Sequence, residues 1–282
     1  MRSRPPQLSD DDLRAALGHI DELQYLPVGA GSYHWRADDR FVTVDDLDDK
    51  PFLGDNPEAV FDGLRRALGT AVALRQTGLD FVVAPLPAID GEVVHRLGAH
   101  YAVSVYPWLG ELKAFRKTLS DDERSALREI LARLHSAPGS IASLAREVRP
   151  EVPHRAGLDR AVKSLTVPPV VGDWLARFDD LVAALEARAV ERVVTHGEPH
   201  SGNIIRTESG FVLVDWDMLG LAPRERDLWV VAGGDSELCE LYRLRWRLDD
   251  ISWAVREMTS GDAEIGARAL RNSLEYEPFT RD

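Results

Sequence analysis

The chain is best understood from residues 193–218, which read VVTHGEPHSGNIIRTESGFVLVDWDM. Two short apolar runs, 204–205 and 211–214, flank a polar segment that ends in Gly210, a pattern typical of a β-hairpin. Polar residues lie just outside both runs: His196, Glu198 and Asn203 before the first, Asp215 and Asp217 after the second. Paired strands lie about 5 Å apart, so we expect these two polar sets to converge. Such an arrangement suits the binding of a metal–phosphate and the alignment of a hydroxyl group.

The composition is that of a soluble protein with more than one lobe. At 282 residues the chain exceeds one ordinary core. Its net charge of −13 argues against a nucleic-acid partner and is compatible with a cationic small substrate. No apolar run reaches membrane-spanning length, and the first residues lack the apolar core of a secretory signal. The single cysteine, Cys239, fits a reducing cytoplasm, so we expect a cytoplasmic protein without membrane contact.

The N-terminal part is predicted to be rich in β-structure. Cap signals and apolar periodicity predict helices over 10–24 and 57–78. Strand patterns occur at three places within 26–44 and again at 92–97 and 101–105. Gly29 and Gly31 form a turn before the second strand. The glycines allow close approach of backbone N–H groups to a phosphate, although a plain hairpin turn explains them equally well. Pro107 and Gly110 then end the last strand and indicate a link.

The remainder is predicted to be mostly helical. A capping box at 120–123 starts a helix that ends at His135. Residues 136–172 suggest loops with a short helix, 173–189 a further amphipathic helix, and 236–256 one or two packed helices. Residues 262–282 are expected to continue as helix and then fray. The predicted organisation is a lobe over 1–105, a hinge at 106–110 and a helical lobe over 111–282.

At its motifs the chain resembles the aminoglycoside phosphotransferase family of the protein-kinase-like fold. The matching residues are His196-Gly197-Glu198 with Asn203, Asp215-Trp216-Asp217, and Arg226-Asp227-Leu228. The family usually has His-Gly-Asp, four residues, Asn, and a later Asp-aromatic-Asp. The resemblance implies an α+β, two-lobed fold, with a nucleotide-binding first lobe and a second lobe that carries the catalytic loop and substrate cleft.

The resemblance also implies phosphoryl transfer from ATP or GTP to a hydroxyl, assisted by Mg²⁺. Asn203 and Asp215 match the magnesium ligands, and Asp217 adds a water-mediated contact. Glu198 lies where the family has its catalytic aspartate. His196, grouped with it as a catalytic residue, braces the loop, and Asp227 pins that loop. His135, which ends a helix, is expected to be structural.

On the nucleotide side the resemblance implies the glycine turn with Ser32, and Val105 behind the base. The backbones of Tyr106 and Trp108 would hold adenine. The family's third strand carries a phosphate-binding lysine, but here that position is Thr43 or Asp45. The only lysine of this lobe, Lys50, lies beyond the strand, and Arg36 on the preceding strand is a possible substitute. Glu58 and Asp62 are the candidates for the helix acid that pairs with that lysine, and neither has an evident partner.

The predicted substrate is a small hydroxylated and cationic molecule, such as an aminoglycoside-type antibiotic, which would make the protein a resistance kinase. Acidic residues of the second half were considered for its binding: Asp217, Glu225, Asp235, Glu237, Glu240, Asp249 and Asp250. Two alternatives remain open, a catalytically weak or inactive ligand-binding protein and a choline-, homoserine- or sugar-type kinase. A third takes His196, Glu198 and His200 as metal ligands on one strand face, although the neighbouring glycines and Pro199 favour a loop.

Overall fold

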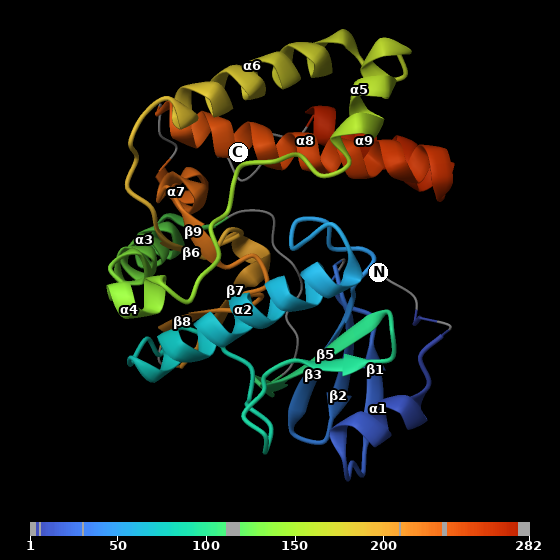
Figure 1. Ribbon diagram of the computed structural model, residues 1–282, viewed down its shortest axis with the longest axis vertical. Coiled ribbons are helices and arrows are strands. Elements are labelled where there is room, and N and C mark those ends of the chain that lie inside the picture. The colour runs from blue at the N-terminus through green and yellow to red at the C-terminus, as the bar shows by residue number, and fades with distance from the viewer. Residues whose placement is uncertain are drawn as a thin grey trace. The chain divides into compact units, whose positions relative to one another are not determined.

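The computed structural model describes residues 4–5, 7–29, 31–110, 119–208, 210–232 and 236–275 (Figure 1). Within them the chain divides into two compact units. The first unit takes in the residues up to 110 together with 137–146 and 203–219. The second unit takes in 119–136, 147–202 and 220–275.

The first unit is built on a five-stranded antiparallel sheet of order β1-β2-β3-β5-β4. Its strands are β1 (Leu23–Leu26), β2 (Tyr33–Ala37), β3 (Arg40–Asp46), β4 (His95–Leu97) and β5 (Tyr101–Pro107). Alternate residues such as Trp35, Val42 and Val44 are fully buried, because successive side chains of a strand point to opposite faces. The predicted strand at 92–97 is shorter, and the predicted hinge residues Tyr106 and Pro107 lie at the end of β5.

Three helices belong to this unit: α1 (Asp10–Leu17), α2 (Pro57–Gln76) and the short α4 (Gly139–Ala142). The predicted helix over 10–24 is too long, because Gly18 has a φ of 80° and the chain then enters β1. The start of α2 is confirmed, since the Asn56 side chain accepts a hydrogen bond from the Ala59 N–H. Gly63 of α2 touches the preceding loop, where an added Cβ would meet the Leu53 carbonyl oxygen at 2.6 Å.

The predicted hairpin is confirmed as β7 (Ile204–Thr207) paired with β8 (Gly210–Leu213). Its register pairs Ile204 with Leu213, so the residues before β7 and after β8 emerge at the same end. Leu213 also donates its N–H to the Phe81 carbonyl at 2.7 Å and accepts from the Val83 N–H at 3.0 Å. These bonds fix the hairpin to the segment that follows α2.

The second unit is mainly helical, as predicted. It contains α3 (Asp121–His135), α5 (Arg155–Lys163), α6 (Pro169–Glu186), α7 (Glu225–Ala232), α8 (Glu237–Ser260) and α9 (Ala263–Glu275). A two-stranded sheet joins β6 (Val193–Thr195) to β9 (Gly220–Ala222), and η1 (Ser201–Asn203) is a single 3₁₀ turn before the hairpin.

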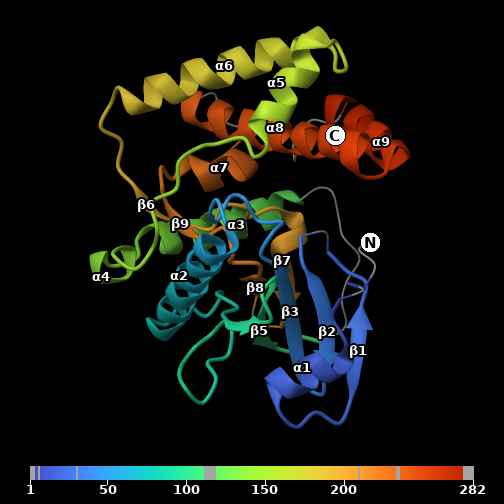
Figure 2. The ribbon, with the colours of Figure 1, turned by 45° about the vertical axis from the view of Figure 1, so that its right-hand side comes forward.

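Helix α6 packs along α8, and α5 and α9 pack on α8 as well (Figure 2). Their shared core includes Leu158, Phe178 and Ile251. The predicted capping box of α3 is present between Ser120 and Glu123. Residues 276–282, where the tail was expected to fray, lie outside the described part of the chain. No helix of the described residues is long and apolar enough to cross a membrane.

Candidate active site

The loop that follows β6 is held by one buried carboxylate, that of Asp227 on α7. Its Oδ2 accepts the His196 N–H at 2.9 Å and its Oδ1 accepts the Gly197 N–H at 2.7 Å. The His135 imidazole also lies 2.9 Å from Oδ2. Burial alone would raise the pKa of Asp227, but the hydrogen bond from His135 and the neighbouring charges lower it below its usual value. Asp227 is therefore an ionised clamp, in the position predicted for a structural brace.

Gly197 cannot carry a side chain in this loop. Its φ is 103°, and an added Cβ would meet the Arg226 guanidinium at 2.5 Å. That guanidinium is 4% exposed and donates to the Thr195 hydroxyl at 2.8 Å, and this hydroxyl in turn donates to the Gly220 carbonyl. The chain of contacts ties the loop to the β6–β9 sheet.

His196 is fully buried and its Nδ1 accepts the Glu198 N–H at 3.2 Å. A ring nitrogen that accepts carries no proton, so any proton of the neutral ring is on Nε2. Its contacts are those of a loop brace.

The Glu198 side chain is 24% exposed and lies 3.9 Å from the Arg245 guanidinium of α8. Arg245 is itself held by Asp249, one helical turn later, at 3.1 Å, and by the Glu151 carbonyl at 3.3 Å. We did not predict Arg245 from the sequence. The signal available there was only the helical spacing of Arg245 and Asp249.

His200 follows Glu198 in the loop and lies edge-on to Trp246 of α8, with ring centroids 5.2 Å apart. Burial, with a smaller contribution from His196, lowers the pKa of His200 to about 4. Its Nδ1 accepts the Gly202 N–H at 3.0 Å. The described residues contain no group of three His, Cys, Asp or Glu that could hold a metal, so the structure does not support the interpretation of His196, Glu198 and His200 as metal ligands.

The predicted magnesium ligands lie in the first unit, at the open end of the hairpin. The Val214 N–H donates to the Asn203 carbonyl at 3.0 Å, which places Asn203 beside the residue that precedes Asp215. Asp215 has a φ of 66°. Residues other than glycine rarely adopt this left-handed backbone conformation, and where they do it often marks a functional site. An amide and a carboxylate oxygen fit magnesium, which is commonly held by one or two carboxylates together with substrate phosphates. The hairpin thus brings Asn203 and Asp215 together, whereas His196 and Glu198 belong to the second unit.

Lys50 is the site residue that the sequence left unassigned. Its ammonium lies 2.6 Å from Asp217 Oδ2 and 2.9 Å from Asp45 Oδ1, and its side chain is only 3% exposed. Burial lowers the pKa of Lys50, but Asp217, Asp45 and Asp215 more than offset this and raise it well above its usual value. The lysine is therefore charged throughout the ordinary pH range.

Arg36, the predicted substitute for the strand lysine, and the two candidate helix acids have other partners. The Arg36 guanidinium donates to the Asp38 carbonyl at 3.0 Å and stacks over Trp108. Glu58 pairs with Arg96 at 2.7 Å, and Asp62 pairs with Arg65 at 3.6 Å.

The predicted nucleotide residues are all in the first unit and have varied partners. The Ser32 hydroxyl donates to Asp45 Oδ1 at 2.6 Å, while Gly29 has a φ of 71° and lies beside His34. The Thr43 hydroxyl lies 3.3 Å from His34 Nδ1. An added Cβ on Gly31 would meet nothing within 4 Å.

Some backbone groups of the segment predicted to bind the base already form hydrogen bonds within the protein. The Val105 carbonyl accepts the Leu86 N–H at 2.7 Å, and the Trp108 N–H donates to the Asp39 carbonyl at 3.2 Å. Burial raises the pKa of Tyr106.

Several of the acids considered for substrate binding are neutralised by arginines of the second unit. Glu240 pairs with Arg177 and Glu237 with Arg188. Asp235 lies outside the described residues. Burial raises the pKa of Asp250 to about 7, with Asp249 adding to the effect.

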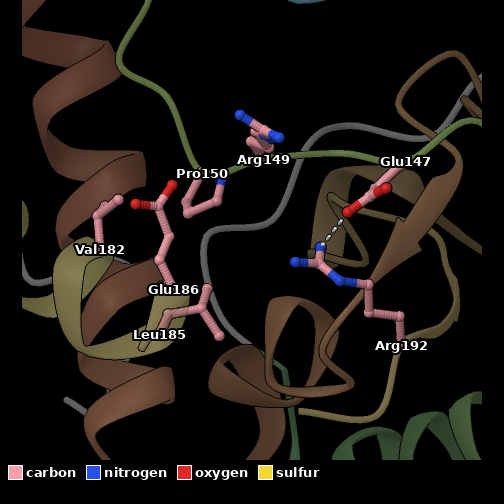
Figure 3. Close-up of a pocket in the computed structure, with 7 residues that line it drawn as sticks. All are labelled: Glu147, Arg149, Pro150, Val182, Leu185, Glu186 and Arg192. Carbon is pink, nitrogen blue, oxygen red and sulfur yellow. Dashed lines mark ion pairs between the residues drawn. The ribbon is translucent and has the colours of Figure 1, made fainter. Parts of the chain in front are cut away.

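A small cavity of about 290 Å³ also lies in the second unit (Figure 3). An ion pair of 3.3 Å between Glu147 and Arg192 lies at one side of it, and Glu186 with its α6 neighbours lies at the other. None of its lining residues is a predicted site residue.

Comparison with solved structures defines the fold class. Spectinomycin phosphotransferase APH(9)-Ia, in complex with ADP and spectinomycin, matches with a TM-score of 0.64 at 18% identity, covering 95% of this chain and 94% of that one. Amicoumacin kinase hAmiN, in complex with AMP-PNP, Ca²⁺ and Ami, matches with a TM-score of 0.62 at 12% identity, covering 97% and 95%. The fold is thus the α+β, protein-kinase-like fold, with a β-sheet in the N-terminal region and helices in most of the rest.

The family follows from the sequence itself. Residues 34–259 match the model of the phosphotransferase enzyme family, APH. Since this match spans far more than half of the chain, the protein belongs to that family. A curated relative is Protein StrN of Streptomyces griseus, 28% identical over 280 residues, which cover 87% of this chain and 83% of StrN.

Proposed function

We propose that this protein is a nucleoside-triphosphate-dependent phosphotransferase that acts on a hydroxyl of a small polar molecule. The observation that carries the proposal is the clamped loop of the second unit. Asp227 and Arg226 hold its backbone while Glu198 keeps a partly exposed carboxylate, five residues before Asn203 in the chain. A rigid loop that offers one carboxylate suits the alignment of a hydroxyl nucleophile, because such transfers depend on positioning.

Separate tasks are assigned to the two units. In the second unit, Glu198 accepts a hydrogen bond from the substrate hydroxyl and takes its proton, while His196 and Asp227 hold the loop. In the first unit, Asn203 and Asp215 would hold Mg²⁺, which neutralises phosphate charge when bound. Asp217 follows Asp215 by two residues. The nucleotide, ATP or GTP, would lie against the sheet near the turn of Gly29, Gly31 and Ser32.

The substrate we propose is hydroxylated and cationic, of the aminoglycoside antibiotic type. The net charge of −13 favours the approach of a cation. Solved relatives of the same fold are described with spectinomycin and with gentamicin as ligands. On this basis the protein would confer resistance by phosphorylating the antibiotic.

The test is to incubate the purified protein with Mg²⁺, ATP or GTP, and a panel of aminoglycosides together with choline, homoserine and simple sugars. Products are followed by mass spectrometry. We expect a phosphorylated product from an aminocyclitol or aminoglycoside. A product from choline, homoserine or a sugar alone would reassign the substrate, and silence across the whole panel with both nucleotides would contradict the proposal.

The binding-only alternative rests on the missing strand lysine. The buried, charged Lys50 weakens that argument, because a cation is available in the same unit. We therefore favour the enzyme.

A further inference from the structure

The position of Lys50 in the first unit requires a physical explanation. A lysine this deeply buried loses its hydration, which is costly unless charged partners and hydrogen bonds replace the water. Asp45 and Asp217 supply two such partners, at 2.9 and 2.6 Å. An ammonium carries three donors. The two carboxylates account for two of them. The other contact of the ammonium among the described residues is with the Phe52 ring, whose centroid is 5.7 Å away, so a phosphate oxygen could accept from the third donor.

The partners of Lys50 come from segments that are far apart in sequence. Asp45 lies on β3, at one of the two positions where a strand lysine was expected. Asp217 follows β8, two residues after the proposed magnesium ligand Asp215, and lies 2.6 Å from the Lys50 ammonium. The lysine is thus directed toward the proposed metal–phosphate site of this unit.

Asp45 also connects Lys50 to the glycine turn. Its Oδ1 accepts the Ser32 hydroxyl at 2.6 Å as well as the Lys50 ammonium. One carboxylate oxygen therefore links the turn after β1 to the lysine after β3. A fixed carboxylate with two charge-assisted partners of this kind restricts where the ammonium can point.

The loop that carries Lys50 is itself fixed. The Leu53 N–H donates to the Lys50 carbonyl at 3.0 Å, and the Leu53 carbonyl packs directly on Gly63 of α2. From this loop the long stem of lysine is sufficient to reach between β3 and the end of β8.

We propose that Lys50 is the cation that binds the β- and γ-phosphates of the nucleotide, and that Asp45 is the residue that positions it. This inference rests on the proposed phosphotransferase function. The strand position expected to carry the lysine then holds the acid Asp45, and the lysine comes from the loop beyond the strand.

The experiment compares the binding of AMP, ADP and a non-hydrolysable ATP analogue, each with Mg²⁺, by calorimetry. The variants are Lys50→Met, the double variant Asp45→Asn with Lys50→Met, and Lys163→Met as a control on the exposed side of α5. The double variant removes one charge of each sign, so it avoids leaving Asp45 buried and unpaired. Asp45→Asn alone tests the positioning role.

For the unmodified protein we expect affinity to increase from AMP to ADP to the ATP analogue. Lys50→Met and the double variant should lose roughly 10- to 100-fold in affinity for the ATP analogue, the loss of one charge-assisted hydrogen bond, with AMP affinity almost unchanged. Asp45→Asn should raise the KM for nucleotide more than it lowers kcat. Lys163→Met should behave as the unmodified protein.

Two outcomes would overturn the inference in distinguishable ways. If the unmodified protein phosphorylates a substrate while the double variant keeps the full preference for the ATP analogue over AMP, Lys50 is only structural and the proposed function stands. If the unmodified protein binds no magnesium–nucleotide at all, both the inference and the proposed function are wrong.

Discussion

Glu198 is one methylene longer than the aspartate that the family usually has at this position, and Arg245 lies 3.9 Å from its carboxylate. Shortening the side chain withdraws the carboxylate from the hydroxyl by more than 1 Å. We therefore predict that Glu198→Asp lowers kcat by about 10- to 100-fold, because a displacement of this size is costly for a group that aligns a nucleophile.

The measurement is steady-state kinetics with the substrate identified from the panel. The KM for nucleotide should remain the same, because Glu198 lies in the second unit and has no proposed contact with phosphate. A kcat of the aspartate variant equal to or higher than that of the unmodified protein would show that the alignment of the hydroxyl does not depend on the length of the Glu198 side chain.

Two histidines should make the folded state sensitive to acid. The pKa values of His34 and His200 are lowered to about 4, in both cases mainly by burial, against about 6.5 in an unfolded chain. The unfolded chain therefore binds protons between pH 6.5 and 4 that the folded chain does not. Their stabilising contribution is full above pH 6.5 and is lost as the pH falls toward 4, by up to about 3 kcal/mol for each.

Urea unfolding at pH 7.5, 6 and 5 measures this loss. The double variant His34→Asn with His200→Asn should show a flatter dependence than the unmodified protein, while His19→Asn, whose side chain is 93% exposed, should leave the slope unchanged. Asp250 opposes the trend, because its pKa is raised to about 7, but all three proteins keep this residue, so the difference between their slopes reports on the histidines. Identical slopes in all three proteins would contradict the assignment.

Helix α2 offers a test at the level of one element. An added Cβ at Gly63 would meet the Leu53 carbonyl at 2.6 Å, whereas one at Gly69 of the same helix would meet nothing within 4 Å. Gly69→Ala should stabilise the fold by about 0.5–1 kcal/mol, the usual gain for alanine in a helix. Gly63→Ala should destabilise it by roughly 1–3 kcal/mol and displace the loop of Lys50.

Thermal unfolding of the two variants gives the comparison, and magnesium–nucleotide affinity reports on the loop. We expect weaker nucleotide binding for the Gly63 variant alone. If Gly63→Ala is as stable as Gly69→Ala, the loop does not depend on its close contact with α2.

The elements that could be predicted were those with local signals. Asn56 before α2 and the capping box of α3 are recognisable within four residues, and both helices start as expected. The hairpin was equally local. The helix over 10–24 was predicted too long because its apolar spacing continues past Gly18, where a positive φ ends the helix.

At the scale of the whole chain, long-range partners decided what the sequence could not show. Lys50 and Asp217 are 167 positions apart, and only the folded first unit brings them to 2.6 Å. Arg245 lies 3.9 Å from Glu198 and belongs to α8, a helix that carries none of the recognised sequence motifs. The motif residues themselves were recognisable because their order and spacing are compact, whereas their neighbours depend on tertiary packing.

The central claim is that this protein transfers the γ-phosphate of a nucleotide to a small-molecule hydroxyl with the help of Glu198. Phosphorus NMR of the complete reaction, with the unmodified protein and with Glu198→Gln, tests it most directly. We predict a magnesium-dependent phosphate-ester signal from the unmodified protein, reduced by at least about 100-fold in the variant, which cannot accept the hydroxyl proton. No ester signal from the unmodified protein, or an equal signal from the variant, would contradict the account.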